Sequence, residues 1–296
     1  MKAPLGTSLL ELLVAQALGL MLMAGVLQSL SDALSQQREI EEQFERRESA
    51  QLVALVLQQQ LATAGFVDWT GGGWSLSGGS RSVMAAQTLP GGAALFACPG
   101  DMHGSAWQHA SASPSERPRC GTARSVRHTL QVVRQGTRGE QNTQTSKDCL
   151  QQHSPGPWVV NRLYTHVGNL GAQLLCAGSG NQSGQALVAG VEEWIFRFLV
   201  RHADGQTQWL TTADMGPADA AHWQRVVRIE VCWIQVSQRT GRGGLLMLSD
   251  QSTRPTCQRG ADAQWLTGVA REQGDRRWWQ RHTHTVALIN HVEMNP

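Results

Sequence analysis

The sequence has little charge and lacks the short motifs that mark common enzyme classes. Charged residues make up 16% of the 296 residues and the net charge is +2, so no charge excess points to nucleic acid or to an acidic substrate. Neither the G-x-x-x-x-G-K spacing of a phosphate-binding loop nor the G-x-S-x-G spacing of a nucleophilic serine occurs. We therefore expect a protein that is not an enzyme and that holds no cofactor and no metal.

Charge is scarcest near the N-terminus, where residues 7–30 include a single charged residue, Glu11. About 20 apolar residues, each rising about 1.5 Å along a helix, suffice to cross a hydrocarbon core of about 30 Å. A cleaved secretory signal would instead need a small-residue cleavage site behind a short apolar run. Here the run passes directly into a polar helical sequence. The segment is therefore predicted to be a membrane-spanning helix.

Glu11 is unusual in such a segment, because a carboxylate inside a bilayer costs several kcal/mol. A cut between Gly6 and Thr7 would place a new α-amine close enough to neutralise Glu11, in the same chain or in a neighbour packed alongside. The short head with Lys2, the Gly6 that ends it and the following TSLLELLVA resemble the type III signal of type IV pilins and pseudopilins. An ordinary signal anchor with a stray glutamate is the alternative interpretation.

The resemblance implies a leader of residues 1–6 that a prepilin peptidase removes. The peptidase would cut between Gly6 and Thr7 and N-methylate the new first residue, Thr7. Glu11 would then govern the docking of subunits into a helical fibre. The family usually has phenylalanine where this sequence has Thr7, so the motif is matched with one departure.

The helical sequence continues beyond the apolar run. Residues 31–63 are rich in Gln, Glu, Arg, Leu and Ala and contain neither Pro nor Gly. Gly65 follows at the place of a C-cap, so we predict a transmembrane and spine helix over residues 7–64. A stripe of apolar side chains is expected to lie against a globular head; its members are Ile40, Phe44, Leu52, Leu55 and Val56.

Residues 65–296 are predicted to form that head. Glycine gathers in residues 65–92, which we expect to be a loop wrapped over the head. Six later stretches are rich in β-branched and apolar residues and are bounded by turn residues, which predicts antiparallel strands at 127–134, 159–167, 172–177, 186–200, 226–236 and 282–292. A long helix followed by strands predicts an α+β fold.

Several short strings narrow the resemblance to PilW-type minor pilins. In order, they are DCL at 148–150, VNRLY at 160–164, LLC at 174–176, LVAGVE at 187–192, VVRI at 226–229 and TVALIN at 285–290. The family usually has arginine where Ile289 stands. The resemblance implies a type IV pilin-like fold, in which the long helix packs on an antiparallel sheet with long disulfide-closed loops.

All six cysteines lie beyond the apolar helix, and an even number in an exported region indicates disulfides in an oxidising compartment. We predict the sequential set, which is Cys98 with Cys120, Cys149 with Cys176, and Cys232 with Cys257. The resemblance supports the second pair, because both of its cysteines lie in matching strings. A zinc site at Cys98, His103, His109 and Cys120 is the alternative for the first pair, but it lacks the short ligand spacings of such sites.

Two further clusters lie near the C-terminus. Arginine beside tryptophan can neutralise phosphates and stack on single-stranded bases, so DNA binding is a minor hypothesis for Arg276, Arg277, Trp278, Trp279 and Arg281. The alternative is an exposed turn that feeds the last strand, with the tryptophans packed inward. His282 and His284 alternate along that strand and are expected to form a surface-facing pair.

The PilW resemblance implies a minor pilin that helps to prime pilus assembly and sits at or near the tip, in support of adhesion, twitching motility or DNA uptake. Lys2 before the apolar run fits a single-pass inner-membrane protein with a cytoplasmic N-terminus and a periplasmic head. The implied partners are other minor pilins, the major pilin, the prepilin peptidase, the inner-membrane assembly platform and a PilY-type tip adhesin. The alternatives are a J-type minor pseudopilin of type II secretion and a DNA-binding competence pilin.

Overall fold

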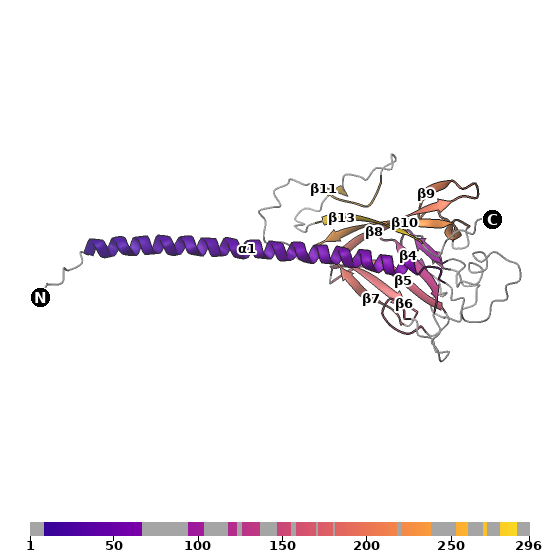
Figure 1. Cartoon of the computed structure of the whole chain (residues 1–296), viewed down its shortest axis with the longest axis horizontal. Coiled ribbons are helices and arrows are strands. Elements are labelled where there is room, and N and C mark those ends of the chain that lie inside the picture. The colour runs from indigo at the N-terminus through magenta and orange to yellow at the C-terminus, as the bar shows by residue number, and fades with distance from the viewer. Residues whose placement is uncertain are drawn as a thin grey trace. The chain divides into compact units, whose positions relative to one another are not determined.

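The computed structural model describes residues 9–66, 94–103, 118–122, 126–136, 147–154, 158–169, 171–179, 181–217, 221–237, 253–259, 269–270 and 279–288. They belong to two compact units, which are considered separately. The first contains residues 9–48 of helix α1 (Leu9–Ala62), and the second contains the remainder of α1 and the strands. Figure 1 labels α1 and most of the longer strands.

Helix α1 is unbroken over 54 residues, as its helix-forming composition predicts. It ends one turn before Gly65, which adopts φ = 71° and donates its N–H to the carbonyl oxygen of Val133 over 2.9 Å. Glycine adopts this left-handed conformation without the steric cost that a side chain adds. The predicted helix end at Gly65 is confirmed.

The face with which α1 packs on the head differs from the prediction. Four residues at helical spacing are buried in the main core, namely Ala50, Val53, Leu57 and Leu61. In the predicted stripe, Ile40, Phe44, Leu52 and Leu55 are exposed, and only Val56 packs against the core. The prediction failed because apolar residues occupy both sides of this helix, and only the stripe from residue 50 to residue 61 keeps a spacing of three and four without a break.

Two antiparallel sheets and a few short elements complete the second unit. The first sheet has the order β1 (Leu95–Cys98), β4 (Thr129–Gln135), β5 (Trp158–Gly168), β6 (Gly171–Gly178), β7 (Asn181–Ala189). The second has the order β13 (Trp279–Ala287), β10 (Val226–Val236), β8 (Val191–Arg201), β9 (Thr207–Thr211). The short elements are the pair β2 (Met102–His103) and β3 (Arg119–Cys120), the pair β11 (Thr253–Arg254) and β12 (Val269–Ala270), and α3 (Ala221–Gln224).

The strands predicted at 127–134, 159–167, 172–177 and 226–236 correspond to β4, β5, β6 and β10. The stretch 186–200, predicted as one strand, is divided at Gly190 between β7 of the first sheet and β8 of the second. Gly190 has φ = 82°, and a Cβ there would lie 2.6 Å from the carbonyl oxygen of Val236. Its own N–H donates to the carbonyl oxygen of Ala172 over 2.6 Å. The glycine therefore lets the chain change sheets in one residue.

The last strand, β13, begins at Trp279, three residues before the predicted start, and ends at Ala287. Residues 289–292 of the predicted strand and residues 67–92 of the predicted loop lie outside the described residues. Strands β1 and β9 and helix α3 were not predicted.

The three disulfides join the cysteines in the order of the sequence: Cys98–Cys120, Cys149–Cys176 and Cys232–Cys257. This is the predicted sequential set, and it leaves Cys98 and Cys120 no free thiol for the alternative zinc site. Together, the long N-terminal helix, the two antiparallel sheets and the three disulfides confirm the α+β fold class that the sequence predicts.

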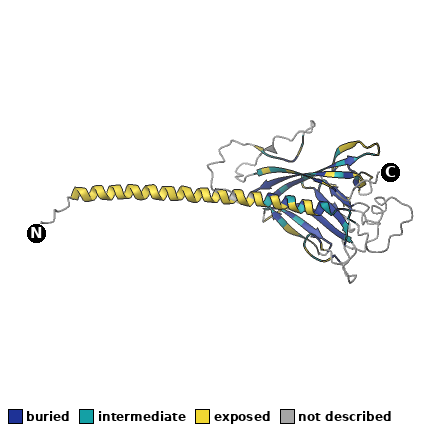
Figure 2. Ribbon diagram, viewed as in Figure 1, coloured by how far each residue is buried: buried dark blue, intermediate teal, exposed yellow. Residues whose placement is uncertain are grey.

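Buried side chains line both sheets, as the dark blue residues in Figure 2 show. One polar member of this interior is His128, which is 8% exposed and lies 6.0 Å from the ring of Phe196. Its Nδ1 accepts the backbone N–H of Phe196 over 3.4 Å and lies 3.0 Å from the hydroxyl oxygen of Thr212. Burial lowers the pKa of His128 from 6.5 to about 4, so the folded chain holds the imidazole neutral.

Acidification is expected to destabilise the head through His128. The unfolded chain binds a proton at this residue below about pH 6.5 whereas the folded chain does so only near pH 4, so stability falls as the pH falls through this window. Between pH 7.5 and pH 5 the loss from this residue is about 2 kcal/mol. Urea unfolding in detergent, followed by pulse proteolysis, measures it.

The matched pair for that measurement is His128→Asn and His166→Asn. Asparagine can still accept a hydrogen bond at the place of Nδ1 but does not titrate, so His128→Asn should flatten the pH dependence. His166 is exposed on β5, so His166→Asn should leave the dependence unchanged. An equally steep loss of stability in His128→Asn would contradict this origin.

Candidate functional site: an exposed apolar helix and a pocket in the head

The first candidate is the surface of α1 over residues 9–48. Large apolar side chains are exposed all around its first half: Leu9, Leu10, Leu12, Leu13, Val14, Leu18, Leu20, Met21, Leu22, Met23, Val26, Leu27 and Leu30. An 18-residue window in this helix reaches a mean hydropathy of 2.0, so the helix is long and apolar enough to cross a membrane. Exposed apolar surface on this scale calls for lipid or for other apolar helices.

Glu11 lies in the first turn of α1 and is exposed, within this otherwise apolar surface. An acid near a helix N-terminus is favoured by the positive end of the helix dipole. Gly6 and Thr7, the predicted processing and methylation positions, lie outside the described residues. The cleavage, methylation and docking roles therefore stay predictions.

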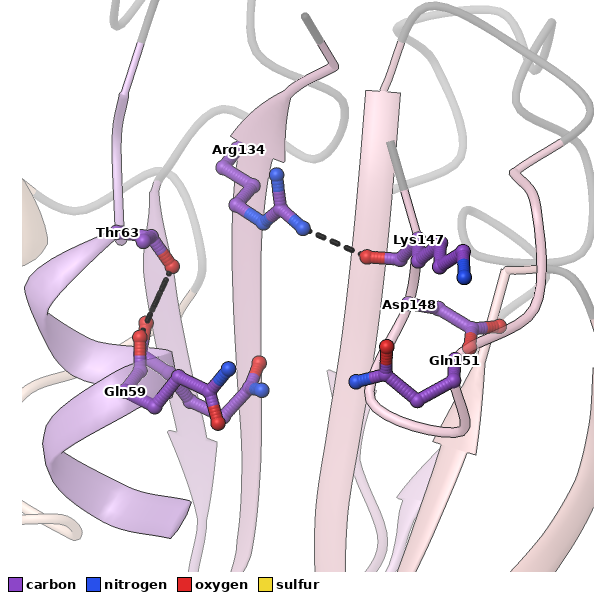
Figure 3. A pocket seen from close by; sticks show the side chains of 7 residues that line it. Gln59, Thr63, Arg134, Lys147, Asp148 and Gln151 are labelled. Carbon is purple, nitrogen blue, oxygen red and sulfur yellow. Dashed lines mark hydrogen bonds between the residues drawn. The ribbon is translucent and has the colours of Figure 1, made fainter. Parts of the chain in front are cut away.

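The second candidate is a polar pocket of about 250 Å³ within the head. Figure 3 shows it between the last turns of α1, the end of β4 and the turn that precedes β5. It is lined by Gln59, Gln60, Thr63, Arg134, Lys147, Asp148 and Gln151. The side-chain amides of Gln59 and Gln151 face each other across the gap in this view.

Arg134 is the half-buried cation of this pocket. Its Nη2 donates to the carbonyl oxygen of Lys147 over 2.6 Å, which fixes the guanidinium against the opposite wall (Figure 3). Burial lowers the pKa of Arg134, while the nearby charge of Asp148 raises it by a smaller amount. At neutral pH the group remains charged and only partly hydrated.

The floor and the far wall of the pocket are rigid. The buried Gln60 accepts a hydrogen bond from Nδ2 of Asn161 over 2.5 Å, and Oδ1 of Asn161 accepts the backbone N–H of Cys149 over 3.0 Å. Cys149 is in turn bonded to Cys176 of β6. These contacts join the helix, β5 and the disulfide loop, so the pocket is formed before any ligand arrives.

Gln151 reaches the pocket from a strained turn. Its φ is 62°, the only positive φ of a non-glycine residue in the part of the chain that the structure describes. The turn is closed by Oδ1 of Asp148, which accepts the backbone N–H groups of Leu150 and Gln152 over 2.8 and 3.0 Å. A residue held in this conformation stores a free energy on the order of 1 kcal/mol, which such turns retain most often at functional sites.

The basic and aromatic cluster near the C-terminus is only partly described, since Arg276, Arg277 and Trp278 lie outside the described residues. Trp279 is half-buried; its Nε1 donates to Glu192 over 3.3 Å. The guanidinium of Arg281 donates to the carbonyl oxygen of Thr256 over 3.1 Å. Both side chains thus form hydrogen bonds within their own chain.

The expectation that His282 faces the surface was wrong. The register places His282 opposite Trp233 of β10, and the two rings stack with centroids 5.2 Å apart. Burial lowers the pKa of His282. His284 lies on the same face of β13 by alternation, and this face carries the buried Val286, so the pair belongs to the core-facing side.

Sequence reasoning found the apolar helix and Glu11 but missed the pocket. The pocket residues come from three segments that are distant in the sequence, and no spacing connects them. The available signals were the run Gln58, Gln59, Gln60 near the helix end and Asp148 directly before Cys149.

No protein-family model matches the sequence, and no curated protein matches it. Among solved structures, the chain is similar to a type IV-like pilin from Thermus thermophilus, with 13% sequence identity and a TM-score of 0.40 over 83% of this chain and 98% of that one.

Proposed function

We propose that this chain is a minor pilin of the PilW type, which takes part in priming type IV pilus assembly. One observation carries the proposal: an exposed apolar helix with a single carboxylate, Glu11, continues without a break into a helical segment that is buried in a disulfide-bonded β head. The role is structural, so the surface of the helix takes the place of an active site.

The helix would act by exchanging one apolar environment for another. Before assembly, residues 9–30 rest in lipid, and Glu11 is the costly group. After assembly, the same surface packs against the helices of other pilins, and Glu11 pairs with the α-amine that cleavage after Gly6 creates on a neighbour. Since the helix buries a similar apolar surface in lipid and in the pilus, the ion pair supplies the difference in free energy between the two states.

This role gives the expected locations and partners. The chain would first span the inner membrane with a cytoplasmic N-terminus and a periplasmic head, and later sit at or near the pilus tip. The prepilin peptidase, the assembly platform, the major pilin, other minor pilins and a PilY-type adhesin would be its partners. The three disulfides would keep the head folded outside the cytoplasm.

The test is deletion of the gene, followed by pilus shearing, transformation and secretion assays on the same strain. The proposal expects fewer sheared pili and normal type II secretion. A secretion defect with normal piliation would instead identify a J-type pseudopilin. A transformation defect with normal pilus number would favour the DNA-binding competence pilin.

A further inference from the structure

The pocket in the head carries a polar ligand site that the proposed function does not use. We propose that it binds the carboxylate of an aspartate or glutamate side chain that a neighbouring protein presents. The pocket supplies one guanidinium, Arg134, and amide donors from Gln59 and Gln151, which Figure 3 shows directed at the same gap. The proposed function enters only in the identity of that neighbouring protein, which would be another subunit of the pilus.

Arg134 is the anchor for an anion. Its guanidinium has five N–H donors, and the carbonyl oxygen of Lys147 takes one of them over 2.6 Å. No carboxylate forms an ion pair with it among the described residues, although its burial already removes part of its hydration. An arriving carboxylate would restore that lost solvation with two parallel hydrogen bonds.

Arg134 gives the site its preference for a charged ligand, and the glutamines complete the set of donors. An amide NH₂ donates to a carboxylate oxygen at the positions that Arg134 leaves open, so both oxygens can be bonded. Gln60 already accepts from Asn161, and this bond orients its amide at the floor. Gln60 and Arg134 are held by hydrogen bonds before binding, which reduces the cost of ordering these two side chains around a ligand.

Charge limits the ligand to a monoanion. Asp148 lines the pocket next to the cations Arg134 and Lys147, so the three side chains together contribute one net positive charge. A dianionic phosphate would face the Asp148 carboxylate without a second unopposed cation. A carboxylate matches the charge.

The strained conformation of Gln151 is the second, independent observation. A glycine at φ = 62° would close the same turn without strain, yet the chain carries a long amide whose end lies in the pocket. Backbone strain of this kind occurs most often at ligand-binding and active sites, so the Gln151 conformation supports a ligand site here.

The experiment titrates the full-length chain in detergent micelles with blocked glutamate, N-acetyl-glutamate N-methylamide, and follows the side-chain N–H signals of arginine and glutamine by NMR. The matched probe is blocked glutamine, which has the same shape and no charge. We expect saturable shifts with a millimolar Kd for glutamate and at least tenfold weaker binding of glutamine. Equal binding of the two probes, or tighter binding of inorganic phosphate, overturns the proposal.

Variants separate the site from the fold. Gln59→Ala with Gln151→Gly removes two amides at an exposed helix position and at a positive φ, so it should weaken glutamate binding about tenfold while raising Tm by about 2 to 4 °C. Gln58→Ala alters the adjacent exposed glutamine, which does not line the pocket, and should leave binding unchanged. Unchanged binding in the double variant overturns the proposal. Binding is measured on the isolated chain, whereas the pilin role is tested by the deletion phenotype. A failure to bind glutamate would therefore overturn the ligand site without deciding the pilin role.

Discussion

Replacing Glu11 with alanine is expected to leave leader processing intact and to lower the number of surface pili at least tenfold in a strain that lacks the native copy. Glu11 is the single charged residue of residues 7–30, so no other side chain in that run can replace it. Removing one partner of a buried ion pair costs about 3 to 5 kcal/mol, because the other charge is left unpaired. In the proposed assembly that unpaired charge is the α-amine of a neighbouring subunit.

The measurement combines sheared-pilus quantification with an immunoblot that separates precursor from mature chain. Glu11→Gln keeps the size of the side chain and removes its charge, so it should behave like Glu11→Ala. Gln16→Ala is the matched control, because Gln16 is an exposed, uncharged polar residue of the same helix. Normal surface piliation in Glu11→Ala would refute the docking role.

The parts of this fold that the sequence predicts are those with long, uniform patterns. Helix α1 has a helix-forming composition and a glycine just beyond its end, and the 11 residues of β10 are mostly β-branched or apolar. The disulfide pairing could be predicted because each cysteine pairs with the next cysteine in the sequence, across separations of 22 to 27 residues.

Elements without a pattern of their own were missed. β1 is four residues long and buried at every position, so it shows no alternation. β9 has only five residues and lies at the edge of its sheet. α3 has four residues, which are too few to show a helical pattern in the sequence. Their conformations are fixed by tertiary contacts, which local composition does not encode.

The same limit applies to the candidate sites. The exposed apolar helix and Glu11 are local features, so composition alone indicates them. The pocket exists because the topology brings the end of β4 and the turn at Asp148 beside the last turns of α1. The packing face of that helix was equally hidden, since Leu52 and Leu55 are exposed while the smaller Ala50 and Val53 are buried.

Trp223→Ala is expected to cause the largest loss of stability in the head, about 3 to 5 kcal/mol. Trp223 is fully buried on α3, and its ring meets Phe96 of β1 and Phe198 of β8 in edge-to-face contacts, each with centroids 5.1 Å apart. Its Nε1 also donates to the carbonyl oxygen of Gly216 over 3.2 Å. Because one ring contacts both sheets, its removal leaves a cavity that neither sheet can fill alone.

Urea unfolding followed by pulse proteolysis in detergent measures this loss, because cleavage reports on the head while α1 stays in the micelle. Trp223→Phe keeps part of the ring contact and loses the hydrogen bond, so it should fall between wild type and alanine. Trp209→Ala is the matched control: this half-exposed ring on the edge strand β9 lies 5.6 Å under the guanidinium of Arg197, and its loss should cost about 1 kcal/mol. A loss in Trp223→Ala no larger than that in Trp209→Ala would contradict this role of Trp223. The remaining contacts of the core would then hold the two sheets together, and the marginal stability typical of such a domain would not depend on this one residue.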